Sequence, residues 1–93
     1  MNPWFSESDF VGKSIRELSD ICHYKGIAIF DLDIKDKIGD NGTLIWEDIC
    51  IKDFIKEFPR YSDAIVERYN DFFGTVVLRI RNIYRFKHQN KSN

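Results

Sequence analysis

The chain has 93 residues, of which 43 % are hydrophobic, 15 % aromatic and 31 % charged, and its formal net charge is −1. This length allows one domain (1–93) with a modest core, and the hydrophobic content excludes an intrinsically disordered chain. No apolar run approaches the roughly 18 residues of a membrane span and no signal-peptide pattern is present, so we expect a cytoplasmic protein without membrane contact. Cys22 and Cys50 are then expected to be reduced. The spacing of Cys and His predicts no metal site and no other cofactor.

Two capping boxes predict helix starts in the first part of the chain: Ser6 with Asp9, and Ser14 with Glu17. The first predicts one helical turn within an aromatic N-terminal arm, residues 1–13. The second precedes apolar residues at helical spacing and predicts a helix that ends at Gly26.

Residues 27–35 have many β-branched side chains and an apolar period of two, which predicts a strand. We expect Phe30, Leu32 and Ile34 to face the core, with Asp31 and Asp33 on the opposite face. Gly, Asn and Asp residues in 36–42 predict a turn, because these residues tolerate left-handed backbone.

Residues 43–51 predict the return strand of a hairpin, and apolar residues at helical spacing predict a helix from Ile51 to Pro59, which stops it. Ser62 is expected to cap a further helix that ends at Gly74; its apolar stripe comprises Ile65, Tyr69, Phe72 and Phe73. Residues 75–87 predict the strongest strand of the chain, and 88–93 a frayed polar tail.

These elements predict an α+β fold in the order α-β-β-α(α)-β. We expect a two-layer α/β sandwich with helices on one face of a three-stranded, mainly antiparallel sheet of order 2-1-3. An open edge of that sheet would allow either a monomer or a homodimer.

The segment from Ile27 to Asp33, IAIFDLD, resembles the nucleophile loop of the haloacid dehalogenase superfamily. The resemblance implies that Asp31 attacks phosphorus and that Asp33 is the general acid/base, with Mg²⁺ beside them. The remaining motifs of that superfamily are missing, and its doubly wound parallel sheet needs more strands than this chain provides. We therefore expect a protein that is not an enzyme.

Charge is partitioned along the chain: residues 1–74 contain nine Lys and Arg against fifteen acids, whereas residues 75–93 contain five Lys and Arg and no acid. One face of the last strand is expected to be basic; it comprises Arg79, Arg81, Arg85 and Lys87. These cations either pair with Asp31 and Asp33 within the sheet, or bind an external anion such as nucleic acid or an acidic protein.

An acidic set surrounds the predicted hairpin: Asp31, Asp33, Asp36, Asp40, Glu47 and Asp48. These carboxylates either keep a sheet face soluble or mimic nucleic-acid phosphates in the groove of a nucleic-acid-processing enzyme. Our leading hypothesis is a small protein-binding module of the inhibitor, immunity-protein or phage anti-defence (anti-CRISPR-like) kind. The alternative is a nucleic-acid-binding protein that uses the basic last strand.

Overall fold

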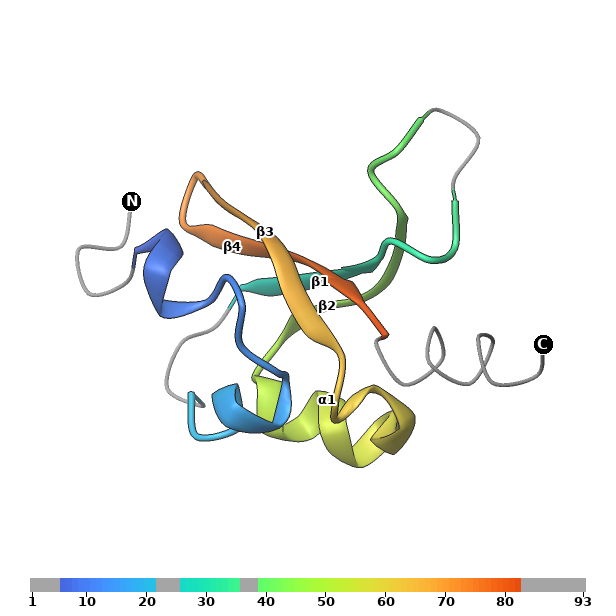
Figure 1. The fold of residues 1–93 in the computed structure, drawn as a ribbon. Helices are drawn as coiled ribbons and strands as arrows, with labels where there is room; N and C mark the ends of the chain where they lie inside the picture. The colour runs from blue at the N-terminus through green and yellow to red at the C-terminus, as the bar shows by residue number, and fades with distance from the viewer. Residues whose placement is uncertain (1–5, 22–25, 36–38, 83–93) are drawn as a thin grey trace, which may run out of the picture.

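The computed structural model describes residues 6–21, 26–35 and 39–82, which form an α+β fold with one open, mixed, four-stranded sheet (Figure 1). The strands are β1 (Ile27–Asp31), β2 (Thr43–Ile49), β3 (Ile65–Phe72) and β4 (Thr75–Arg81). The helical elements are α1 (Ile51–Glu57) and three 3₁₀ turns, η1 (Glu7–Asp9), η2 (Arg16–Leu18) and η3 (Pro59–Tyr61). Among the described residues, α1 and the turns η2 and η3 lie below the sheet in this view, and its other face is uncovered.

The sheet order is β2-β1-β4-β3, so it consists of two hairpins whose inner strands, β1 and β4, run parallel. The prediction that the last strand lies beside the first is confirmed. The prediction of three mainly antiparallel strands is wrong. After α1 the chain forms the additional edge strand β3 before turning into β4, and this extra reversal makes β4 parallel to β1.

The strand β3 occupies residues for which the sequence predicted a helix after Ser62, and that prediction is wrong. A bulge lies between Val66 and Arg68, so the inward-facing side chains Val66 and Tyr69 are three residues apart instead of two. The bulge interrupts the period of two along the strand, and the apolar residues Ile65, Tyr69, Phe72 and Phe73 stand at helical spacing in the sequence although they form no helix.

The two faces of β1 are the reverse of those predicted. Ile27, Ile29 and Asp31 point toward the helices and are fully buried, whereas Phe30 lies on the other face beside Arg79. Leu32 and Ile34 follow the strand; Leu32 is buried, as predicted, whereas Ile34 is exposed. Both faces of β1 carry apolar side chains, so alternation alone did not decide which face meets the helices.

Local capping predictions are confirmed, but the first helix is short. Ser14 N–H donates to Glu17 Oε1 at 2.8 Å, and Glu17 N–H donates to Ser14 Oγ at 3.2 Å. The backbone hydrogen bond from Ser14 lowers the pKa of Glu17. This capping box leads into η2 alone instead of a helix extending to Gly26; residues 22–25 lie outside the described residues.

The helix at Ile51 is confirmed as α1, which ends before Pro59, and the hairpin β1–β2 is confirmed as antiparallel. A compact aromatic cluster joins this helix to the sheet: Phe54 contacts Trp46, Phe58 and Tyr61 through rings 5.4–6.5 Å apart. These contacts fix the helix layer against one face of the sheet and leave the other face exposed.

Candidate interaction surface

Asp31, one of the acidic residues singled out in the sequence, is buried. Only 1 % of it is exposed, its Oδ2 accepts a short hydrogen bond from the Tyr61 hydroxyl, and its Oδ1 accepts one from Asp33 N–H at 2.7 Å. The expectation that Asp31 belongs to an exposed acidic surface is therefore wrong. The helix layer covers this end of β1, and Tyr61 in η3 donates the hydrogen bond that Asp31 accepts there. This long-range contact was not evident from the sequence.

Asp33 forms an ion pair with Arg81 of the same protein. Its carboxylate accepts hydrogen bonds from Arg81 Nη1 at 2.9 Å and from Asn82 N–H at 3.0 Å. Arg81 also donates through Nε to Glu67 Oε2 at 2.7 Å, and this bond is the main cause of the raised pKa of Arg81. The proposed pairing between the acidic and basic strands is thus present for Arg81 and Asp33.

The other acidic positions do not extend this pair into a cluster. Asp40, Glu47 and Asp48 are exposed on the loop before β2 and on β2 itself, and Asp36 lies outside the described residues. Within the described part of the chain, no group of three or more His, Cys, Asp or Glu side chains is arranged to hold a metal ion. With Asp31 buried and bonded to Tyr61, the two carboxylates do not form an open Asp-x-Asp site.

Arg79 differs from Arg81 in having only uncharged partners among the described residues. Its guanidinium lies 5.0 Å from the Phe30 ring centroid, donates through Nη1 to Asn70 Oδ1 at 2.7 Å and through Nε to the Asn41 carbonyl at 3.2 Å. Its positive charge therefore remains available at the surface. Arg85 and Lys87, the remaining predicted basic positions, lie outside the described residues.

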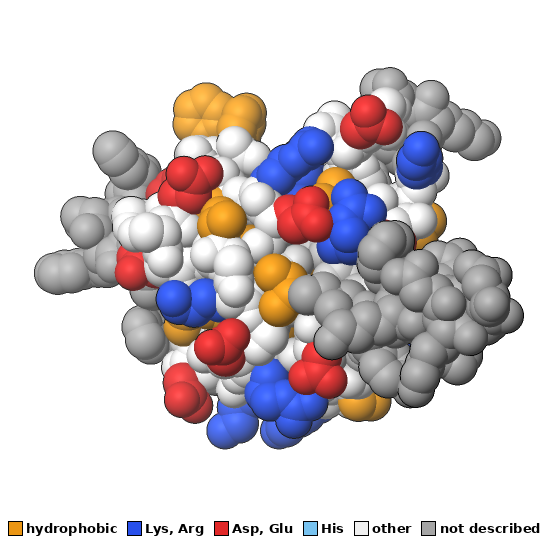
Figure 2. Space-filling view, in the orientation of Figure 1, with side chains coloured by type: hydrophobic (Ala, Val, Ile, Leu, Met, Phe, Trp, Pro, Cys, Tyr) orange, Lys and Arg blue, Asp and Glu red, His pale blue; other side chains and the backbone are white. Residues whose placement is uncertain are grey.

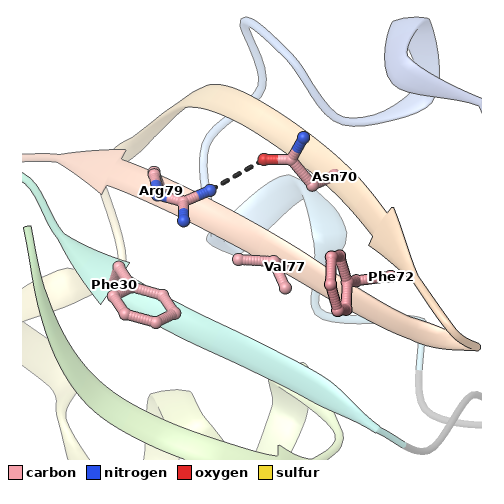
Figure 3. A pocket seen from close by; sticks show the side chains of 5 residues that line it. All are labelled: Phe30, Asn70, Phe72, Val77 and Arg79. Carbon is pink, nitrogen blue, oxygen red and sulfur yellow. Dashed lines mark hydrogen bonds between the residues drawn. The ribbon is translucent and has the colours of Figure 1, made fainter. Parts of the chain in front are cut away.

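A shallow hollow of about 360 Å³ opens on the uncovered face of the sheet. Figure 3 shows its lining from three strands: Phe30 of β1, Val77 and Arg79 of β4, and Asn70 and Phe72 of β3. We call this uncovered face of the sheet the open face. It also includes Leu44 of β2, which pairs with Phe30. It combines aromatic and aliphatic side chains with the guanidinium of Arg79, and Arg68 lies on the same face because it pairs with Arg79 in the register of β3.

Two exposed phenylalanines end the open face at the β3–β4 turn, and the sequence had assigned both to a helix. Phe72 is 64 % exposed and Phe73 is 92 % exposed, and their rings contact each other edge to face at 4.9 Å. Figure 2 shows a group of hydrophobic side chains that projects from the surface at the upper left, where Figure 1 places this turn. Only β4 alternates regularly; the bulge in β3 interrupts the matching alternation before the turn, so the sequence did not show a hairpin here.

Phe73 also has an unfavourable backbone conformation. Its φ is +52° and that of Gly74 is +85°, as in the hairpin turns that favour Asn-Gly. A bulky side chain in left-handed backbone costs roughly 1–2 kcal/mol. Phe73 therefore lowers stability without contributing to the core.

No family model, no curated protein and no solved structure matches this chain. Within residues 6–21, 26–35 and 39–82, no helix is long and apolar enough to cross a membrane.

Proposed function

We propose that this chain is a small, non-enzymatic protein-binding module that acts by occupying a partner's surface, as inhibitors, immunity proteins and phage anti-defence proteins do. Phe73 carries the proposal. A ring that is 92 % exposed and held in left-handed backbone weakens the fold. Large aromatic side chains at an exposed site contribute most when a partner buries them, so a binding role accounts for the residue.

The neighbouring surface supports this function. Phe72 lies beside Phe73, and the hollow lined by Phe30 and Val77 adjoins Phe72 on the open face. A central aromatic group surrounded by mixed polar and apolar side chains is the composition typical of a protein interface. The acidic hairpin has less support, because Asp31 is buried and Asp33 is paired with Arg81.

The test compares two substitutions that each relieve a left-handed residue. Phe73→Asn should raise the free energy of unfolding by about 0.5–1 kcal/mol, because Asn is favoured at this turn position. The same variant should lose partner binding, because the exposed ring is gone. Asp48→Asn is the matched control, since Asp48 has φ of +60° and lies on β2.

Wild type and both variants would be immobilised and exposed to lysate of the native host, with captured proteins quantified by mass spectrometry. We expect proteins that wild type and Asp48→Asn retain equally and that Phe73→Asn captures at least about tenfold less; binding is then confirmed with the purified partner. Equal capture by all three would contradict the proposal. If Asp48→Asn instead captured fewer proteins, the binding surface would be the acidic hairpin and not the Phe72–Phe73 turn.

A single-stranded nucleic acid is the second candidate, because Phe30 and Arg79 supply an aromatic ring and a cation on one face. Phe30 belongs to β1, so this ring comes from a neighbouring strand and not from the basic last strand itself. Binding of this kind should fall steeply between about 50 and 200 mM salt. Titration of a fluorescent oligonucleotide with wild type and Arg79→Gln measures it directly.

A further inference from the structure

We propose that the open face binds an acidic segment of the partner protein, an extended peptide in which a carboxylate side chain stands two residues from a large apolar one. This inference rests on the proposed function and names the chemistry of the partner. It follows from three observations: a row of side chains that crosses the sheet, two arginines in that row that have no carboxylate partner among the described residues, and the position of the hollow.

The row follows from the strand register. Leu44 pairs with Phe30, Phe30 with Arg79, and Arg79 with Arg68, so one residue from each of the four strands contributes. Neighbouring strands are about 4.8 Å apart. The row is therefore apolar at its β1–β2 end and cationic at its β3–β4 end, within two or three strand spacings.

The cations at one end of this row are not neutralised by the described part of the protein. Arg81 bonds to Asp33 and Glu67, and Arg16 bonds to Asp63, but the described residues offer neither Arg79 nor Arg68 a carboxylate partner. Like charges on directly opposed residues of neighbouring strands are mutually unfavourable. A carboxylate from a partner would relieve this repulsion and form charge-assisted hydrogen bonds.

Arg79 is already held in a binding position. Its hydrogen bonds to Asn70 Oδ1 and the Asn41 carbonyl fix the guanidinium above the Phe30 ring, as Figure 3 shows for Asn70. They use two of the five N–H donors of the group. The others can bind a carboxylate without a new loss of side-chain freedom, which favours affinity.

The hollow fixes the spacing of the ligand. Val77 precedes Arg79 by two residues on the same face of β4. Phe72, which pairs with Thr75, lies diagonally from Val77 and lines the same hollow. Residues two apart on a strand are about 7 Å apart. An extended peptide that places its carboxylate on Arg79 therefore places the side chain two positions away over Val77 and Phe72.

The charge of the described residues favours such a peptide over nucleic acid. They contain nine Lys and Arg against fourteen Asp and Glu, so this part of the protein is net acidic and repels a polyanion such as nucleic acid more strongly than it repels a single carboxylate. Among the coloured, described side chains, Figure 2 likewise shows acidic and basic groups interspersed, without a continuous basic track. One carboxylate needs only the local pair, Arg79 and Arg68, whereas a strand of nucleic acid needs a succession of cations.

The experiment titrates the full chain with three defined probes: a synthetic octapeptide containing Trp-Ser-Glu, the same peptide with Gln in place of Glu, and an eight-residue oligo-dT. NMR follows the Val77 methyl groups and Arg79 Nε–H. We expect the Glu peptide to bind at least about tenfold more tightly than the Gln peptide, with shifts at both groups. Arg79→Gln and Arg68→Gln should remove the difference in affinity between the two peptides. Arg81→Gln should preserve this difference, because Arg81 is already paired with Asp33 and Glu67.

Equal affinity for the two peptides, no shift at Val77, or tighter binding of oligo-dT would each overturn the inference. Dispersion of the NMR spectrum shows that every variant is folded. The proposed function is tested separately by Phe73→Asn: a partner lost with Phe73→Asn but retained with Arg79→Gln would leave protein binding intact while refuting the acidic peptide.

Discussion

Asp31 and Tyr61 attach the end of β1 to the helix layer. Both side chains are buried, and the Tyr61 hydroxyl donates a hydrogen bond to Asp31 Oδ2. Burial, together with the hydrogen bond and the charge of Asp31, raises the pKa of Tyr61 to about 12. Ionised Tyr61 would place two anions in contact in the interior, so the fold favours the neutral phenol.

The free energy of unfolding should therefore fall as pH rises from about 10 to about 12. In this interval the unfolded chain has released the Tyr61 proton while the folded protein keeps it. The contribution of Tyr61 to the free energy of unfolding is therefore complete below pH 10 and is lost progressively as the pH rises through about 12. A shift from 10.0 to about 12 corresponds to roughly 2–3 kcal/mol. Urea denaturation at a series of pH values measures the slope.

Tyr61→Phe is the variant that separates this group from the other titrating residues. It should be less stable than wild type by about 1–3 kcal/mol near neutral pH, because buried Asp31 loses a donor. Its stability should also decline less above pH 10. Tyr69→Phe keeps the Tyr61–Asp31 bond, so it should still lose stability above pH 10. Parallel curves for wild type and Tyr61→Phe would show that Tyr61 does not cause the alkaline loss.

At the scale of elements, β3 is an edge strand that the N-terminal arm partly covers. Gly12 N–H donates to the Val66 carbonyl at 2.8 Å, Val66 N–H donates to the Lys13 carbonyl at 2.9 Å, and Ser14 forms a bridge with Ile65. Phe10 anchors the arm: it is fully buried and its ring stacks on Tyr69 at 5.1 Å. The arm thus satisfies backbone groups that an open edge would expose.

Phe10→Ala should lower the free energy of unfolding by about 3–5 kcal/mol, because it removes a buried ring and leaves a cavity. It should also expose the start of β3 and increase hydrogen exchange at Val66 N–H. Chemical denaturation and amide exchange measure the two effects. Phe73→Asn removes an exposed phenylalanine and provides the contrast, and similar losses in both variants would mean that the arm does not stabilise β3.

Local features of these elements were predictable, and long-range ones were not. Both capping boxes and the end of α1 before Pro59 depend on residues within one turn, and the sequence shows them directly. The strand β3 was missed because a bulge interrupts its alternation, and Phe73 was missed with it. Arg79 and Arg81 were recognised as basic, but only the strand register shows that Arg81 is paired while Arg79 lies beside Phe30.

At the scale of the whole molecule, both edges of the sheet resist pairing with another copy. The arm covers the beginning of β3, and β2 has two register irregularities opposite β1. Asp48, in left-handed backbone, lies within the irregularity between Trp46 and Ile49. Bulges bend and twist an edge strand, which hinders the regular hydrogen bonding that a second strand needs. The molecule therefore offers partners its open face and its Phe72–Phe73 turn more readily than its edges.

We accordingly expect the isolated protein to be a monomer, which sedimentation velocity over a wide concentration range will measure. Phe10→Ala should self-associate more than wild type, because it uncovers the start of β3. Phe73→Asn distinguishes the remaining possibilities. A wild-type dimer that Phe73→Asn dissociates would show that the exposed turn binds a second copy, whereas a dimer that persists in Phe73→Asn would show that an edge strand pairs despite its bulges.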